Sequence, residues 1–331
     1  MKTVAVARRA MATRFEILLH GDDMVRLRAA GEEALNEVER LEAHLSLYRP
    51  ASDISRVNAR ASFEPVRIEP SLFRLLQHAQ KLSRESGGAF DSTIAPLVRC
   101  WGFMGGTGQM PEEEEIKEAC ARVGMDHIAL CEEDFTVRFL REGMMLDLGA
   151  IGKGYAVECA AEILVEAGAA CALIHGGTST VHALGSPPDA EAWKVAVQSP
   201  EAEAVSASEL SQADATQESL SESVLAVVPL KDEAMSVSAV HGRSFVVEGR
   251  TFGHVIDPRT GYPAQNALLA AVVLPSATET DALSTALLTL GAVGHDRVSG
   301  LRDGMRTLLA YRTDGTNELR VESRGLNLKA K

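Results

Sequence analysis

The chain has 331 residues, 46% of them hydrophobic and 24% charged, which is the composition of a globular protein and enough length for one large domain or two ordinary ones. The formal net charge of −13 disfavours nucleic acid or an anionic membrane as a general partner, so any bound anion must be held by local groups. The five cysteines form no CxxC pair, which disfavours a zinc site or a disulfide framework, and because no secretory signal or run of 18 apolar residues is present we expect a cytoplasmic protein without membrane insertion.

The N-terminal part predicts one strand followed by helices. Residues 13–20 read as a strand, and residues 22–45 place apolar side chains at helical spacing after a pair of aspartates. Ser71 is expected to cap a second helix, which the glycines at 87–88 end. Four glutamates at 112–115 are interpreted as a solvated helix start.

A glycine-rich turn is expected in the middle of the chain. Residues 146–164 predict a strand, a turn that carries Lys153, and then a helix. Backbone N–H groups at such a helix start are suited to bind anions. The spacing of Gly149, Gly152 and Gly154 matches neither a Walker loop nor a dinucleotide fingerprint, so the turn alone is a weak signal.

Two strands and an insertion follow. Residues 171–177 and 193–197 have strand patterns. Residues 201–224 contain no Gly, Pro, Lys or Arg and are rich in Ser, Ala and Glu. We interpret them as a mobile acidic insertion rather than a domain boundary; the alternative is a short exposed helix.

The segment GHVIDPRTGYP, residues 253–263, predicts a rigid turn at the end of a strand. Pro258 fixes its own backbone and pushes the preceding residue out of the helical region. The turn is therefore expected to present His254, Asp257 and Arg259 close together, a combination suited to phosphate chemistry. The structural alternative is a β-turn with a solvated carboxylate and guanidinium.

The C-terminal part predicts a buried strand over 268–275 and a helix that starts in a capping box at Ser276. On that helix Asp281 and Thr285 are four residues apart, so both oxygens project from one face. The closing segments are expected to form an antiparallel hairpin around residues 314–315.

Three of these features together indicate a Mg²⁺-dependent pyrophosphate site. Asp281 and Thr285 offer hard oxygen ligands, Lys153 adds a cation at a glycine turn, and His254 is titratable near neutral pH. The Asp-x-x-x-Thr pair is unspecific by itself, since an aspartate in a first helical turn commonly serves the helix dipole.

The chain resembles the flavin transferase (ApbE) family, the FAD:protein FMN transferases. The resemblance is collinear and rests on the blocks MATRFEI, LYRPASDISRVN, GGAFDSTIAPLVRCWGF, LDLGAIGKGYAVE, IHGG, HVIDPRTGYP and TDALSTALLTLG. It implies an α+β fold of mixed β-sheets flanked by helices, T-fold-like, as one compact unit over 1–331 with the insertion at about 201–224. It also implies Mg²⁺-dependent transfer of FMN from FAD to a Thr or Ser hydroxyl of a target flavoprotein, with release of AMP.

The resemblance assigns site residues by matching positions. The flavin-binding positions are Met11, Tyr48, Ala89, Phe90, Asp91, Asp147, Lys153 and Val255. The Mg²⁺ positions are the Ala150 carbonyl, Asp281 and Thr285, with Ser284 as a weaker candidate. The general base is expected to be His254, with Asp257 as the second choice.

Two departures from the family pattern concern the acceptor. After IHGG the family usually has an acidic or amide residue, whereas this chain has Thr178-Ser179-Thr180. An SGxYxRxF-like block is replaced by SAVHGRSF at 238–245. Two alternatives to FMN transfer therefore stay open: hydrolysis of FAD to FMN and AMP, and a flavin-binding protein without catalysis.

Overall fold

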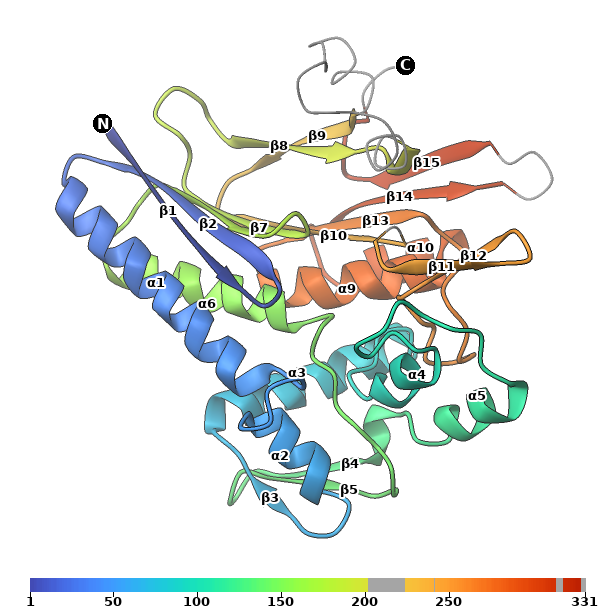
Figure 1. Ribbon diagram of the computed structural model, residues 1–331. Helices are drawn as coiled ribbons and strands as arrows, with labels where there is room; N and C mark the ends of the chain where they lie inside the picture. Colours follow the sequence, from blue (N-terminus) through green and yellow to red (C-terminus); the bar gives the residue numbers. More distant parts are fainter. Residues whose placement is uncertain (202–223, 241, 314–317, 329–331) are drawn as a thin grey trace.

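The computed structural model describes residues 1–201, 224–240, 242–313 and 318–328. Its largest element is an eight-stranded sheet in the order β1-β2-β6-β7-β10-β13-β14-β15 (Figure 1). The strands are β1 (Lys2–Ala10), β2 (Thr13–Gly21), β6 (Ala172–Gly176), β7 (Thr180–Leu184), β10 (Glu233–Ala239), β13 (Leu269–Leu274), β14 (Arg306–Arg312) and β15 (Leu319–Arg324). The α+β class is confirmed, and each strand pair in the described residues is antiparallel, whereas mixed sheets were expected.

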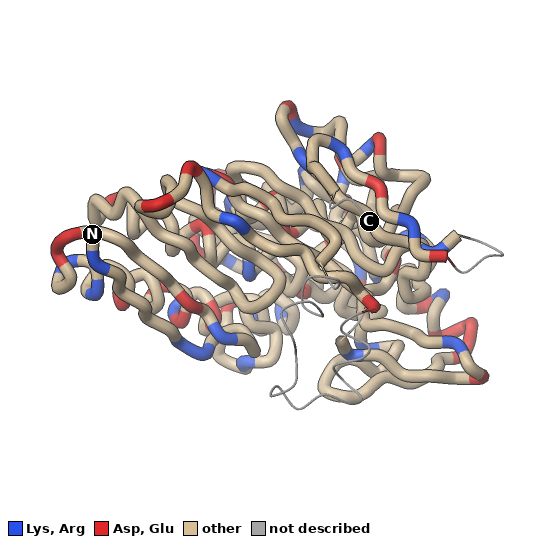
Figure 2. Tube along the Cα trace, turned by 90° about the horizontal axis from the view of Figure 1, so that it is seen from above, with Lys and Arg blue, Asp and Glu red and all other residues tan. Residues whose placement is uncertain are grey.

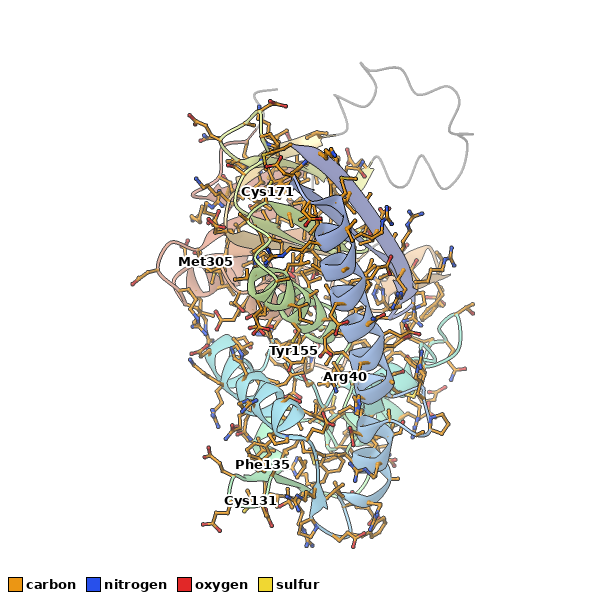
Figure 3. The ribbon with its side chains drawn as sticks, turned by 90° about the vertical axis from the view of Figure 1, so that its left-hand side faces the viewer. Arg40, Cys131, Phe135, Tyr155, Cys171 and Met305 are labelled. Carbon is orange, nitrogen blue, oxygen red and sulfur yellow. The ribbon has the colours of Figure 1, made fainter. Side chains whose placement is uncertain are left out.

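Helices cover one face of this sheet and a hairpin covers the other. The helices are α1 (Met24–Leu45), α6 (Gly152–Glu166) and α9 (Ala277–Leu290), and the hairpin consists of β8 (Trp193–Gln198) and β9 (Val224–Leu230). Each face has its own buried apolar core, so the sheet is stabilised from both sides. Figure 3 views the helical layer from the side, with Arg40 on α1 and Tyr155 on α6 labelled.

A second layer of small elements packs below the helices (Figure 1). It contains α2 (Asp53–Arg60), α3 (Pro70–Ser86), α4 (Ala95–Cys100), α5 (Glu113–Cys120), η1 (Met125–His127) and a sheet of β3 (Val66–Arg67), β5 (Thr136–Phe139) and β4 (Ile128–Cys131). The two-stranded hairpin of β11 (Ser244–Val247) and β12 (Arg250–Gly253) packs against this layer. The short elements η2 (Ala292–Gly294) and α10 (His295–Ser299) follow α9.

Local signals explain where the long helices begin and end. The Asp23 side chain accepts hydrogen bonds from the N–H groups of Val25 and Arg26, which caps α1 as the sequence predicts. Gly87 ends α3 with a positive φ of 68°, a conformation that glycine adopts without a steric penalty. Ser276 caps α9 by accepting from the Glu279 N–H group.

Three local predictions need correction. Helix α3 starts at Pro70, so Ser71 lies inside its first turn and is not the cap. Residues 146–148 form no strand and enter the glycine turn in an irregular conformation. Strand β1 was not predicted; it pairs along its whole length with β2, and because the exposed residues Ala5 and Ala7 are apolar its sequence lacks the polar–apolar alternation that marks a strand.

Two predictions fall wholly or partly outside the described residues. The acidic insertion at about 201–224 lies almost entirely there, between β8 and β9. The antiparallel pairing of β14 with β15 is confirmed, while the predicted turn at 314–315 is itself outside the description.

Three further features are the distribution of charged residues, the state of the cysteines and the hydropathy of the helices. Basic and acidic residues interleave along the trace in Figure 2. All five cysteines are free thiols. Within the described ranges no helix combines the length and the apolar character needed to cross a membrane.

Candidate active site

A cavity of about 430 Å³ lies where the helical layer, the small lower layer and the β11–β12 hairpin meet. Most of the predicted site residues line it: Tyr48, Ala89, Phe90, Asp91, Asp147, Ala150, Lys153, His254, Val255, Asp281 and Thr285. They come from five separate stretches of chain, so the fold brings together what the sequence keeps up to 237 positions apart. Among the described residues Met11, Asp257 and Ser284 are predicted site residues that do not line it.

The glycine turn at the start of α6 fixes the position of Asp281. The N–H group of Gly154 donates to Asp281 Oδ2 at 2.9 Å, and the carboxylate is buried. A Cβ atom at Gly154 would lie 2.2 Å from the Ala277 carbonyl oxygen and 2.7 Å from Asp281 Cβ. Gly154 is therefore required for the close contact between α6 and α9 that holds this carboxylate at the cavity wall.

Substitution of Gly154 by alanine is expected to destabilise the protein. The added methyl group must push α6 away from α9, which costs about 1–3 kcal/mol of unfolding free energy for an overpacked core position. Gly152→Ala is the matched control, because a Cβ there meets only ordinary contacts at 3.7 Å or more. Denaturant unfolding of both variants measures the difference, and equal stabilities would contradict the assigned packing.

The oxygen donors at the Asp281 end of the cavity have the chemistry that Mg²⁺ prefers. Asp281 Oδ2 accepts from Gly154, whereas Oδ1 faces only the Lys153 ammonium, at 4.0 Å, among the described contacts. Thr285, whose hydroxyl donates to the Asp281 carbonyl at 3.2 Å, also lines the cavity, and Ala150 borders it from the glycine turn. Mg²⁺ is commonly held by one or two carboxylates plus water and phosphate oxygens, so this sparse oxygen set fits the ion.

The same residues explain why Ser284 is set apart. Its hydroxyl is fully buried, donates to the Asp281 carbonyl at 3.0 Å and shares a 2.8 Å hydrogen bond with Ser238. Ser238 also lies 3.2 Å from Thr285 Oγ1. Ser284 thus supports the wall from behind. In the described part of the chain, no three or more His, Cys, Asp or Glu side chains gather closely enough to hold a metal ion.

Lys153 is held near this end by the turn that carries it. Its Nζ atom donates to the Gly149 carbonyl at 3.2 Å and lies 4.0 Å from Asp281 Oδ1. The ammonium therefore places a positive charge at the cavity wall, in a long ion pair with the Asp281 carboxylate. A pyrophosphate group at this position would meet a cation and the N-terminal end of α6.

Asp91 and Asp147 line the cavity, and their carboxylates accept hydrogen bonds from backbone groups of the protein. The Asp91 carboxylate accepts from the Met125 N–H group at 2.9 Å and from both the N–H and hydroxyl groups of Thr93. Asp147 accepts from the Gly149 N–H group at 2.8 Å. Burial raises the pKa of both carboxyl groups, and these hydrogen bonds oppose the rise. Both residues thus shape the loops of the wall.

The aromatic residues divide between rim and core. Tyr48 keeps 57% of its surface exposed although it borders the cavity, so a ring face is available to a planar ligand. Phe90 and Ala89 are each 1% exposed and belong to the main core, and only their cavity-facing atoms border the space. Val255 also lines the cavity.

His254 is held in one orientation by the backbone of Arg243. The Arg243 carbonyl accepts from the His254 N–H group at 3.0 Å and lies 3.3 Å from Nδ1. A proton on Nδ1 satisfies this contact and leaves Nε2 as the acceptor. Burial, followed by the charges of Arg243 and Lys153, lowers the pKa of His254, so the imidazole stays neutral further into the acid range.

Asp257 and Arg259 pair with each other outside the cavity. Asp257 accepts from Arg259 Nε at 2.9 Å and Nη2 at 2.7 Å, and it is 5% exposed. The turn is anchored below by Trp101, whose Nε1 donates to the Gly261 carbonyl at 2.7 Å. The carboxylate of Asp257 is therefore buried and paired, not solvated as the structural alternative has it, and of the three predicted residues only His254 lines the cavity.

Met11 lies in the tight turn between β1 and β2. It and Ala12 have φ values of 50° and 59°, which are uncommon for residues other than glycine. The Met11 side chain packs against the main core and does not border the cavity in the described structure. Its assignment as a flavin contact gains no support from this placement.

Several cavity residues were not assigned a role in the site from the sequence. Arg243 and Ser238 line the space, as does the Thr178-Ser179 pair after β6. The signals were present: 243 is the arginine position of the SGxYxRxF-like block, and both departures from the family pattern lie in these segments. The departures therefore border the cavity, where a substrate can meet them.

Comparisons with known proteins bear on the family and the fold. Residues 11–308 match the sequence model of the ApbE family. Proteins named FAD:protein FMN transferase from Haemophilus influenzae and Treponema pallidum are 29% and 28% identical to the chain, over 88% and 80% of it and 81% and 72% of their own lengths. Crystal structures of an ApbE protein from Thermotoga maritima and of the flavinyl transferase ApbE from Pseudomonas stutzeri each superpose with a TM-score of 0.80 at 25% identity. They cover 93% and 98% of this chain, and 94% and 95% of their own lengths are matched.

Proposed function

Because the chain belongs to the ApbE family, we propose that it is an FAD:protein FMN transferase that depends on Mg²⁺. Its substrates are FAD and a Thr or Ser hydroxyl of an acceptor flavoprotein, and AMP is the second product. The observation that carries the proposal is one cavity lined by the His254 imidazole, the Lys153 ammonium and the buried Asp281 carboxylate, with the Arg243 carbonyl 3.3 Å from His254 Nδ1.

The flavin and the diphosphate occupy different parts of this cavity. Tyr48 offers its exposed face to the isoalloxazine ring, and the segment at 89–91 with Val255 borders the rest of the flavin half. Lys153 and the first turn of α6 bind the diphosphate oxygens. Asp281, Thr285 and the Ala150 carbonyl hold Mg²⁺, which when bound supplies positive charge to the pyrophosphate.

The chemistry needs one proton acceptor and an in-line displacement. The acceptor oxygen forms a bond to the phosphorus of the FMN half, and the bond from that phosphorus to the bridging oxygen breaks. AMP leaves with the bridging oxygen, and the hydroxyl proton passes to His254 Nε2. Lys153 stabilises the negative charge that develops on the leaving phosphate.

Incubation with FAD, Mg²⁺ and an acceptor flavoprotein bearing a Ser/Thr flavinylation site tests this proposal. We expect covalent flavin on the acceptor and one AMP for each FMN attached, detected by in-gel flavin fluorescence and by chromatography of the nucleotides. Free FMN with AMP and an unmodified acceptor would identify FAD hydrolysis. FAD left intact would indicate a flavin-binding protein without catalysis.

The cavity also predicts selectivity among nucleotides. FAD should bind more tightly than FMN or NAD, by about tenfold or more, which corresponds to about 1.4 kcal/mol. The reason is that FAD alone can place a flavin at Tyr48 and a diphosphate at Lys153 together. Titration calorimetry in the presence of Mg²⁺ measures the three affinities, and equal values would contradict the assignment of the two subsites.

A further inference from the structure

Arg243 links three parts of the cavity wall. It lies directly before β11, and its guanidinium Nη1 donates to the Phe103 carbonyl at 3.1 Å. The backbone carbonyl of Arg243 accepts a hydrogen bond from the His254 N–H group and lies 3.3 Å from His254 Nδ1. The side chain is exposed at the cavity, so its charge faces the space where the substrates meet.

The β11–β12 hairpin, which follows Arg243, packs on a cluster of aromatic rings. Phe245 and Phe252 stack on each other with ring centroids 5.5 Å apart, and Phe252 stacks on Trp101 at 5.6 Å. Trp101 is fully buried, and Phe103 packs on Phe245 at 5.7 Å. The backbone hydrogen bond from the His254 N–H group to the Arg243 carbonyl continues the strand pairing of this hairpin, so the position of the imidazole follows from the hairpin.

The charges near His254 and its hydrogen bond to the backbone shift its pKa in opposite directions. The cations are Arg243 and Lys153, and the titratable groups that share the cavity are Tyr48, Asp91, Asp147 and Asp281. After burial, the Arg243 charge is the largest influence that lowers the pKa of His254, ahead of Lys153. The hydrogen bond to the Arg243 carbonyl acts in the other direction and raises the pKa. Arg243 therefore acts on this imidazole through both its backbone and its side chain.

We propose that Arg243 is a positioning residue that sets both the tautomer and the charge state of His254. Its carbonyl holds the proton on Nδ1, so that Nε2 faces the cavity with a free lone pair. Its guanidinium opposes a second proton on the ring. The role in catalysis rests on the proposed function: the proton that Nε2 accepts is the one lost by the acceptor hydroxyl as its oxygen bonds to phosphorus.

An NMR titration of the full chain in Mg²⁺ buffer tests the proposal without reference to turnover. The ring nitrogens of His254 should report a proton on Nδ1 in the neutral form. Arg243→Gln should raise the pKa of His254, because a positive charge is removed, whereas Arg243→Lys should keep it close to wild type. Arg250→Gln, on the same hairpin and away from the cavity, is the charge-matched control and should leave it unchanged. An unchanged pKa in Arg243→Gln, or a proton on Nε2 in the wild type, would overturn the proposal.

The pH dependence of transfer separates this role from a structural one. The acid limb of kcat/KM should move to higher pH in Arg243→Gln, so that the loss is about threefold or more larger near pH 6 than near pH 8.5. Arg243→Lys should restore the wild-type profile. A loss independent of pH would overturn the positioning role even if the protein transfers FMN. If the protein transfers none, the proposed function fails while the titration still decides what Arg243 does to His254.

Discussion

Asp281→Ala is expected to abolish Mg²⁺-dependent transfer of FMN. The substitution removes the one carboxylate among the proposed ligands Asp281, Thr285 and Ala150, and Mg²⁺ depends on charged oxygen ligands for much of its affinity. We expect a loss of about 10²–10³-fold or more in kcat at limiting Mg²⁺, the range seen when a group that stabilises developing charge is removed. FAD binding through Tyr48 and the 89–91 segment should partly survive.

The control for Asp281→Ala must account for the hydrogen bond that the variant also breaks. The Gly154 N–H group would lose its buried acceptor, which costs about 1–3 kcal/mol of stability. Asp281→Asn keeps an acceptor for that N–H group while it removes the charge, so it should retain stability and still lose Mg²⁺ dependence. Normal turnover by Asp281→Asn at limiting Mg²⁺ would place the metal elsewhere.

A graded effect at Thr285 supports the same assignment. Thr285→Val keeps the shape of the side chain and removes a neutral oxygen, so the Mg²⁺ concentration for half-maximal rate should rise several-fold without loss of the maximal rate. Asp303→Asn removes an exposed carboxylate elsewhere and serves as the charge control. The concentration of Mg²⁺ at half-maximal rate, measured for all four variants, ranks the ligands.

The parts of the site that the sequence predicted are those whose geometry is local. Asp281 and Thr285 share a helix face because residues four apart always do, and the cap at Ser276 fixes where that helix begins. The glycine turn places Lys153 by the same kind of local rule, although 146–148 is irregular and not a strand.

What the sequence could not supply depends on contacts between distant segments. In the sequence, Asp257 and Arg259 have the residue types expected of a phosphate site. Their two-residue spacing also permits an ion pair with each other, and only the fold determines which partner they take. Arg243 reaches the cavity because its hairpin stacks on Trp101, a residue 142 positions earlier. Such aromatic packing between distant segments leaves no periodic pattern to read.

His254→Asn is expected to lower kcat by about 10²–10⁴-fold, the usual contribution of a positioned general base. The Asn amide can still donate from the place of Nδ1 to the Arg243 carbonyl, so the loop and FAD affinity should be preserved. Only Nε2 is lost. The residual rate should also lose the acid limb that the wild type shows.

The lowered pKa of His254 determines the pH at which the rate of transfer falls on the acid side. Since burial and two cations depress it, the imidazole remains a neutral base below the pH at which a free histidine protonates, and transfer falls only as pH drops through the depressed value. The transfer rates of the wild type and of His254→Asn across the acid range, at saturating FAD and Mg²⁺, provide the measurement. Because Asp257 is closed off by Arg259, it cannot replace His254 without breaking that pair. Wild-type transfer by His254→Asn would therefore mean that the acceptor loses its proton to water or to a group outside this cavity, and Arg243 would then have no part in the reaction through His254.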